Sequence, residues 1–140
     1  LLTEYPINLD STDIYQRTPI HRAIEMINVA LVNVLIQRGV NLEFENIEKM
    51  TPISMAVRYG EAEMVESLIT AEVNINHQDK RGKTALHEAV VKQNKDIVGL
   101  ILANHPDLEI TSLDGKTAQM MAEEVDNEDL LNLFENKTRD

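Results

Sequence analysis

The sequence predicts an all-α helical solenoid, a stack of similar two-helix units, on the basis of two periodic features. Threonine and alanine recur at one interval, and a second apolar run follows each of the first three alanines. An internal period of about 20 to 50 residues is typical of stacked repeat proteins. The recurring residues, 33 positions apart in each series, are Thr18, Thr51, Thr84 and Thr117, and Ala23, Ala56, Ala89 and Ala122.

Each threonine is predicted to begin the first helix of a unit. Thr18 can cap the free backbone N–H groups of a helix start, and Pro19 occupies the first helical position, where no N–H is needed. Thr51 and Pro52 repeat this pair. Apolar residues at helical spacing follow each start. In the first three units they are Ile20, Ala23 and Ile24; Ile53, Ala56 and Val57; and Leu86, Ala89 and Val90.

The apolar run that begins about eight residues after each alanine predicts a second helix. Helices of roughly 8 to 10 residues are not stable alone in water. Each helix pair must therefore bury its apolar stripe on the pairs before and after it. The runs are Leu31, Val32, Leu35 and Ile36; Met64, Val65, Leu68 and Ile69; and Ile97, Val98, Ile101 and Leu102.

These motifs resemble the ankyrin repeat, a 33-residue unit whose first helix starts with Thr-Pro-Leu-His-x-Ala. The matching segments are Thr-Pro-Ile-His-Arg-Ala at 18–23, Thr-Pro-Ile-Ser-Met-Ala at 51–56, Thr-Ala-Leu-His-Glu-Ala at 84–89 and Thr-Ala-Gln-Met-Met-Ala at 117–122. Turns at 39–42, 72–75 and 105–108 lie in the same register. The resemblance implies a helix pair and a β-hairpin finger in each repeat. It also implies that His21 and His87 bond near Thr18 and Thr84 and tie neighbouring repeats.

The resemblance divides the chain into repeats at 15–47, 48–80, 81–113 and 114–140. Residues 1–14 resemble the end of a preceding repeat, and the chain begins with Leu, so we expect at least one more repeat upstream. Repeat four carries Gln119 and Glu135 at positions that are apolar elsewhere, which predicts a C-terminal cap. Gln16 and Lys49 stand where repeat three has glycine, so we expect less regular turns there.

Composition excludes several classes of function. The 140 residues include 24 acidic and 13 basic side chains, a net charge of −11, which disfavours binding to nucleic acid. There is no cysteine, so neither disulfides nor Cys-ligated metals are possible. No apolar run approaches the roughly 20 residues of a membrane span. We expect an intracellular protein, cytoplasmic or nuclear, without membrane insertion.

Catalytic and cofactor motifs are missing from the sequence. It contains no Gly-x-Gly-x-x-Gly, phosphate loop or calcium loop. His87 and Glu88 begin like a zinc-protease motif, but Val91 stands where the second histidine is required. The acidic stretch 123–129 is interpreted as a solvated loop and helix start. We expect no enzymatic activity, cofactor, metal or small-molecule substrate. The resemblance adds one hypothesis, that Asn76 is a target of asparaginyl hydroxylase.

The resemblance implies that partners bind to the fingertips and the exposed side of the first helices, on the concave face. These positions lie four, three and one residues before each threonine and seven and eight after it. They are mainly apolar or aromatic in repeats one and two and basic in repeat three. Tyr, Met and Arg are enriched in interface cores. The predicted contact residues are Ile14, Tyr15, Arg17, Met26, Ile47, Met50, Arg58, Tyr59, Lys80, Arg81, Lys83 and Lys92.

We therefore predict a concave groove, apolar in its N-terminal half and basic over repeat three. It would bind a protein or peptide that carries apolar anchors followed by acidic residues. The alternative is that these side chains cover their own fingers. The favoured function is a protein interaction module, acting as a scaffold, adaptor or recruiter. A dedicated inhibitor or regulatory subunit, which masks a partner's active or localisation surface, is the alternative; its mark would be tight binding to a single protein.

Overall fold

The computed structural model describes residues 8–139, with the last three described by backbone only. Within this range the chain forms eight helices and no strand, which confirms the all-α solenoid. The helices pair as α1 with α2, α3 with α4, α5 with α6 and α7 with α8. They are α1 (Pro19–Glu25), α2 (Val29–Gln37), α3 (Pro52–Arg58), α4 (Ala62–Thr70), α5 (Ala85–Val91), α6 (Lys95–Leu102), α7 (Ala118–Val125) and α8 (Glu128–Arg139).

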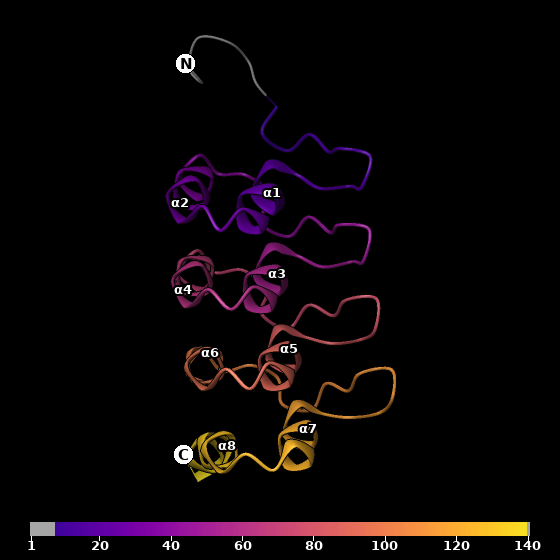
Figure 1. The fold of residues 1–140 in the computed structure, drawn as a ribbon, viewed down its shortest axis with the longest axis vertical. Coiled ribbons are helices and arrows are strands. Elements are labelled where there is room, and N and C mark those ends of the chain that lie inside the picture. Colours follow the sequence, from indigo (N-terminus) through magenta and orange to yellow (C-terminus); the bar gives the residue numbers. More distant parts are fainter. Residues whose placement is uncertain (1–7, 140) are drawn as a thin grey trace.

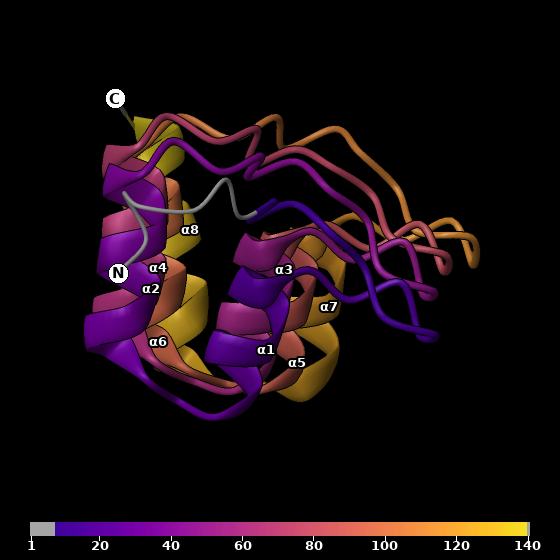
Figure 2. The same cartoon turned by 90° about the horizontal axis from the view of Figure 1, so that it is seen from above.

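The helix pairs stack in chain order, and each helix packs on its counterpart in the next unit. Figure 1 shows α1, α3, α5 and α7 in one column and α2, α4, α6 and α8 in a second. Four loops, which we call fingers one to four, precede the first helices at residues 8–17, 41–50, 74–83 and 107–116. All four fingers project from the same side of the stack (Figure 2).

Each threonine stands at the N-cap of a first helix, as predicted, and Thr18 and Thr51 are each followed by proline. The hydroxyls of Thr84 and Thr117 accept the N–H groups of His87 and Met120, whereas Thr51 forms no side-chain cap bond. The ring of His21 accepts the Thr18 N–H at Nδ1 (3.1 Å), and its Nε2 lies 3.2 Å from the Met50 carbonyl oxygen of the next unit. His87 makes the same two bonds with Thr84 and Lys116. The expected tie between neighbouring repeats is therefore confirmed.

The hydrogen bonds of both capping histidines fit the neutral ring. Burial lowers the pKa of His21 and of His87, because the buried site disfavours the charged ring. Since Nδ1 accepts a backbone N–H, the proton of the neutral ring resides on Nε2, which donates to the carbonyl of the next unit. The tautomer is thus determined by the local cap and serves the contact between units.

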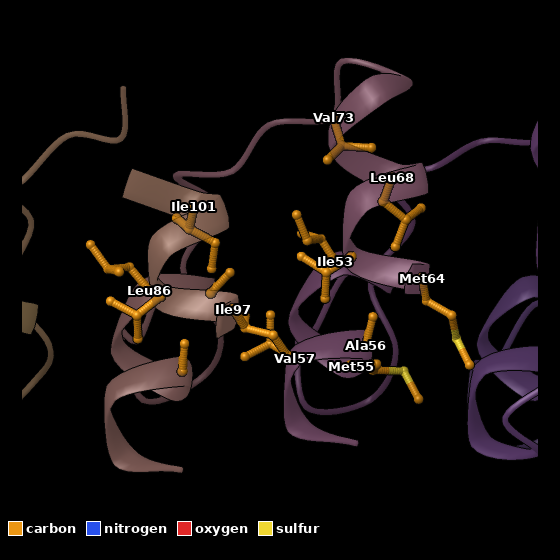
Figure 3. Packing of buried hydrophobic residues seen from close by; sticks show 14 of the residues in the cluster. Ile53, Met55, Ala56, Val57, Met64, Leu68, Val73, Leu86, Ile97 and Ile101 are labelled. Carbon is orange, nitrogen blue, oxygen red and sulfur yellow. The ribbon is translucent and has the colours of Figure 1, made fainter. Parts of the chain in front are cut away.

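Apolar side chains fill the space between successive helix pairs. Figure 3 shows this layer for α3 to α6, where Val57 lies beside Ile97 and Met64 points toward the unit before its own. Because each unit buries its stripe on its neighbours, the core runs through the whole stack. The largest fully buried apolar side chains are Phe134, Ile20, Ile24, Met50, Ile53, Met64, Leu68, Ile97, Ile101 and Leu130.

The fingers are tight turns rather than the expected β-hairpins. In finger three, the Asp79 N–H donates to the Lys83 carbonyl (2.9 Å) and the Gly82 N–H to the Asp79 carbonyl (2.9 Å). Within residues 8–139 no finger contains a strand. The fingers close at the tip and are otherwise held by contacts with adjacent fingers. One such contact is the bond from the Lys80 N–H to the Glu48 carbonyl (3.0 Å).

The expectation of less regular turns in the first two units is wrong. Gln16 and Lys49 adopt φ of 61° and 59°, close to the 77° of Gly82, and donate the equivalent turn hydrogen bonds. The physical reason is a side-chain acceptor beside the tip that all three fingers share. Asp13 Oδ1 accepts two backbone N–H groups of finger one, Asn46 Oδ1 does so in finger two, and Asp79 Oδ1 does so in finger three. These bonds hold the turn whether or not glycine stands at the left-handed position.

The last unit presents a polar face toward its open side. Ile24, Val57 and Val90 are fully buried against the following unit, whereas Glu123, their counterpart, is exposed. Glu135 is exposed and Gln119 half-buried at two further such positions. The polarity agrees with a capping role for this unit, which stays a prediction. The predicted upstream repeat involves residues 1–7, which lie outside the described residues.

Candidate protein-binding face

The predicted face lies in the angle between the fingers and the first helices (Figure 2). A hollow of about 300 Å³ lies at the middle of this angle. Arg58 at the end of α3 forms one wall, and the tips of fingers two and three form the other. Its lining is entirely polar or charged: Glu48, Arg58, Asp79, Lys80 and Arg81.

Five of the six predicted apolar contact residues are exposed. Ile14 at the tip of finger one is the most accessible, at 86%, and Ile47 occupies the same place on finger two. Met26 and Tyr59 cap the C-terminal ends of α1 and α3. Tyr15, beside Ile14, is also exposed. These side chains are therefore available to a partner.

Met50 is the exception, and its predicted exposure is wrong. Its side chain is only 1% exposed and belongs to the core. The prediction rested on the register of the position before each threonine, where Arg17, Lys83 and Lys116 keep part of their length in water. Those side chains end in a charge that must stay solvated, whereas the thioether of Met50 gains by turning inward. Met50 is therefore removed from the face.

Arg17 is held inside its own unit. Its Nε lies 2.8 Å from Asp13 Oδ2, and its Nη1 lies 3.2 Å from Glu25 Oε1. The guanidinium also stands over the Tyr15 ring, 4.9 Å from the centroid. The backbone N–H of Arg17 contributes most to lowering the pKa of Asp13, and the Asp13 carboxylate in turn raises the pKa of Arg17. This arginine has little charge to offer an acidic partner.

Arg58 links three elements. Its Nε lies 3.0 Å from Glu88 Oε1 in α5, and its Nη1 lies 3.2 Å from Glu48 Oε2 in finger two. Partial burial alone would lower the pKa of Arg58, but the hydrogen bonds to Glu88 and Glu48 outweigh it and raise the value. Like Arg17, this side chain is neutralised by neighbouring acids.

Four basic residues of repeat three carry unpaired charge. Lys80, Arg81 and Lys92 are exposed and Lys83 is half-buried, and none of them forms an ion pair with the described side chains. The backbone beneath them is well held. The Arg81 and Lys83 N–H groups both donate to Asp79 Oδ1, at 2.8 and 3.0 Å. We call these four residues the basic cluster.

Two exposed apolar residues occupy predicted face positions but are not among the predicted contacts. Leu113, at the tip of finger four, is 80% exposed, and Val91 at the end of α5 is also exposed. The 33-residue period places Leu113 in register with Ile14 and Ile47, and Val91 seven residues after Thr84. The basic cluster is therefore bordered by apolar side chains on both sides along the stack.

A family model described as ankyrin repeats in three copies matches residues 28–112, more than half of the chain. The chain belongs to the ankyrin repeat family. Ankyrin repeats are in general protein–protein interaction modules and typically not enzymes. A comparison with curated proteins gives no match. The family thus agrees with the resemblance seen in the sequence and supports a binding role over a catalytic one.

Within the described part of this ankyrin array, no three His, Asp or Glu side chains form a group that could hold a metal ion. Among the same residues, no helix has the length and apolar character needed to cross a membrane. The histidines are used in structure instead. His77, for example, contacts Glu45 (2.9 Å) and the Lys49 carbonyl (3.1 Å) in the preceding finger.

Asn76 connects two fingers of the ankyrin array. Its Oδ1 accepts the Asp107 N–H at 2.9 Å, and its own N–H donates to Asn74 Oδ1. The side chains of Asp10 and Glu43 make the equivalent link to the following finger in the earlier repeats. Asn76 therefore has a structural role, and its hydroxylation stays a prediction.

Proposed function

We propose that this ankyrin array is a non-catalytic interaction module that binds a polypeptide in the angle between its fingers and its first helices. The observation that carries the proposal is the basic cluster: four cations, in an otherwise acidic protein, that form no ion pair with any described side chain. The exposed apolar residues of repeats one and two lie next to it along the stack. A module of this kind would serve as a scaffold, adaptor or recruiter.

The N-terminal half of the face would hold apolar anchors of the partner. Ile14 and Ile47 stand on neighbouring fingertips, and Met26 and Tyr59 stand at the ends of neighbouring helices. Isolated exposed apolar residues carry little meaning, but stacking places these in two adjacent rows. Tyr and Met are among the residue types enriched at interface cores.

The basic cluster would hold acidic side chains of the same partner. Arg17 and Arg58 are already neutralised, so most of the positive charge available to a ligand lies on repeat three, with Lys49 of finger two as a further exposed cation that has no ion pair among the described side chains. Acidic surroundings repel an anionic chain elsewhere, so the charge pattern would determine where the partner lies. Since the cluster is exposed, its contribution should weaken with rising ionic strength.

A displayed library of random peptides, selected on the whole chain, tests this proposal. Enriched sequences should combine two or more apolar or aromatic residues with an acidic segment. Tyr59→Ala should weaken binding of the enriched peptides about tenfold, the cost typical of an anchor contact. Val34→Ala, an exposed apolar position on α2 outside the face, is the matched control and should leave binding unchanged. Enrichment of peptides without acids, or equal losses in both variants, would contradict the proposal.

A further inference from the structure

The end of α3 carries the opposite charge to the ends of α1 and α7. In repeats one and four, the residue seven positions after the threonine is an acid, Glu25 or Glu124. Each acid pairs with the cation one position before the threonine, at 3.2 Å from Arg17 and 2.7 Å from Lys116. Repeat two has Arg58 at the first of these positions and no charge at the second. Here a cation, and not an acid, lies at the helix end.

Two carboxylates hold Arg58, and they differ in burial. Glu88 Oε1 lies 3.0 Å from Nε, and the Glu88 side chain is only 9% exposed, so this acid depends on its cationic partner. Glu48 Oε2 lies 3.2 Å from Nη1, and the Glu48 side chain is 53% exposed. Nη2 of Arg58 forms no hydrogen bond with the described residues. Arg58 is thus held by one buried acid and contacts one exposed acid.

The backbone of Glu48 is held at both ends, whereas its side chain has one partner. The Glu48 N–H donates to Asn46 Oδ1 (2.9 Å), and the Glu48 carbonyl accepts the Lys80 N–H (3.0 Å). Among the described side chains, its carboxylate forms an ion pair with Arg58 alone. Exposed ion pairs contribute little to stability. The Glu48 side chain can therefore rotate away while fingers two and three keep their positions.

The hollow beside Arg58 has room for a carboxylate of a ligand. Its volume is about 300 Å³, and Lys80 and Arg81 line it together with Arg58 and Glu48. Asp79 also lines it, but Asp79 Oδ1 accepts two backbone N–H groups of its own finger. Three cations therefore border the hollow, and Glu48 is the acid that can leave it without loss of a finger hydrogen bond.

We propose that the Glu48 carboxylate occupies, in the free protein, the place of a carboxylate of the partner. On binding, a Glu or Asp side chain of the partner replaces Glu48 at Nη1 of Arg58. It also bonds Nη2, because a guanidinium binds a carboxylate through two parallel N–H groups. Lys80 and Arg81 then lie beside the incoming acid. This inference rests on the proposed function, since it concerns one contact within that binding face.

The charge of the hollow favours a carboxylate over a phosphate group. Exchange of one carboxylate for another leaves the charge around Arg58 unchanged, whereas a phosphate of charge up to about −2 adds repulsion from Asp79. The exchange also allows Arg58, which is neutralised in the free protein, to contribute to binding. Glu48 must be displaced first, so it weakens the binding of every acidic ligand.

Fluorescein-labelled hexaglutamate, titrated with the whole chain at low salt and followed by fluorescence polarisation, tests the exchange. Glu48→Gln removes the competing carboxylate and should lower the Kd at least about threefold. Glu45→Gln is the matched control, because Glu45 lies on the same finger, is 42% exposed and does not line the hollow. It should change the Kd by less than about 1.5-fold. Equal effects of the two variants, or no binding of hexaglutamate, overturn the inference.

A double-mutant cycle separates exchange at Arg58 from the simple removal of a negative charge. The background chain carries Arg58→Gln and Glu88→Gln together, which leaves no buried charge without a partner. In this chain Glu48→Gln should change the Kd by less than about 1.5-fold. A gain as large as in the parent chain overturns the exchange and assigns the effect to general repulsion.

A second readout uses the unaltered chain. The carboxylate carbon resonance of Glu48 should shift when hexaglutamate binds, because the carboxylate leaves the guanidinium for water. The resonance of Glu45 should stay in place. An unchanged Glu48 resonance at saturation overturns the inference.

Two further comparisons identify the ligand group and separate this inference from the proposed function. Sodium phosphate should displace hexaglutamate no better than sodium chloride of equal ionic strength, and stronger displacement overturns the choice of a carboxylate. Acidic peptides selected from the displayed library should also bind the Glu48→Gln chain more tightly. Equal affinities for the two chains overturn the exchange alone, whereas a library that yields no acidic peptides contradicts the proposed function.

Discussion

The guanidinium of Arg58 and the carboxylate of Glu88 meet across two neighbouring ankyrin repeats, with Nε and Oε1 3.0 Å apart. Glu88 is buried in α5, whereas the head of Arg58 remains partly in water at the end of α3 and also reaches Glu48 in finger two. One ion-pair network thus connects two first helices and a finger beside the proposed binding face.

The first prediction concerns this network. Glu88→Gln should lower the free energy of unfolding by about 1–3 kcal/mol, because a charge-assisted bond to a buried acceptor is lost. Glu48→Gln removes the exposed partner of the same arginine and should cost less than about 1 kcal/mol. Urea unfolding of both variants measures the difference. Equal losses would show that burial of Glu88 gives the bond no added strength.

The second prediction compares two threonines at one position of the repeat. Thr84 Oγ1 contacts His87 Nδ1 (2.8 Å), whereas repeat two has Ser54 in place of histidine, and Thr51 Oγ1 is buried without a hydrogen-bond partner. Thr84→Val should lower the free energy of unfolding by about 1–2 kcal/mol. Thr51→Val should be neutral or stabilising, since it removes an unsatisfied hydroxyl. Calorimetric unfolding of the two variants measures these changes. A larger loss of unfolding free energy for Thr51→Val than for Thr84→Val would contradict the prediction.

The third prediction separates backbone strain from close contact. Gly82 and Gly115 share φ of 77°, but an added Cβ at Gly82 would stand 2.9 Å from the Leu113 backbone nitrogen, whereas nothing lies within 4 Å at Gly115. Gly115→Ala should lower the free energy of unfolding by about 1 kcal/mol, because alanine is strained in the left-handed conformation. Gly82→Ala should cost at least about 1 kcal/mol more, because fingers three and four must separate. Unfolding in guanidinium measures the free energy of unfolding of both variants. Equal losses would contradict the contact argument.

The fourth prediction concerns pH. The folded pKa values of His21 and His87 are lowered, whereas the unfolded chain has the ordinary value of 6.5. Between these values the unfolded state binds more protons, so the free energy of unfolding should fall as pH decreases from about 6.5. Urea midpoints at about pH 7.5 and 5.5 measure the decline. The double variant His21→Asn, His87→Asn should show a smaller decline, and an identical one would assign the effect to other groups.

The fold was predictable because short helices cannot stand alone and a constant period requires each pair to pack on the next. Thr18 and His21 illustrate this, since cap, helix start and inter-repeat bond all follow from one motif. Side-chain direction was less predictable. Arg17 and Met50 occupy the same repeat position, yet one reaches water and the other turns into the core, because the period specifies the backbone and side-chain chemistry decides the direction.

The exposure of most candidate contact residues was predictable, whereas the pairing of their charges was not. Basic residues were expected to act alike, but Arg17 and Arg58 are neutralised and Lys80 and Arg81 are not. Glu88 lies 30 residues from Arg58, so the sequence alone does not place the two together. The finger turns at Gln16 and Lys49 were also misjudged, because the acceptors at Asp13 and Asn46 hold these turns in the same way as Asp79 holds the turn that contains glycine.

The most direct test of the account is the affinity of the whole chain for a selected acidic peptide, measured by fluorescence polarisation. Reversing two charges of the basic cluster with Lys80→Glu and Arg81→Glu should weaken binding at least about a hundredfold at low salt, and less at high salt. Arg38→Glu, an exposed reversal at the end of α2, should change the Kd by less than about threefold. Equal effects of the two reversals would contradict the assignment of the binding face.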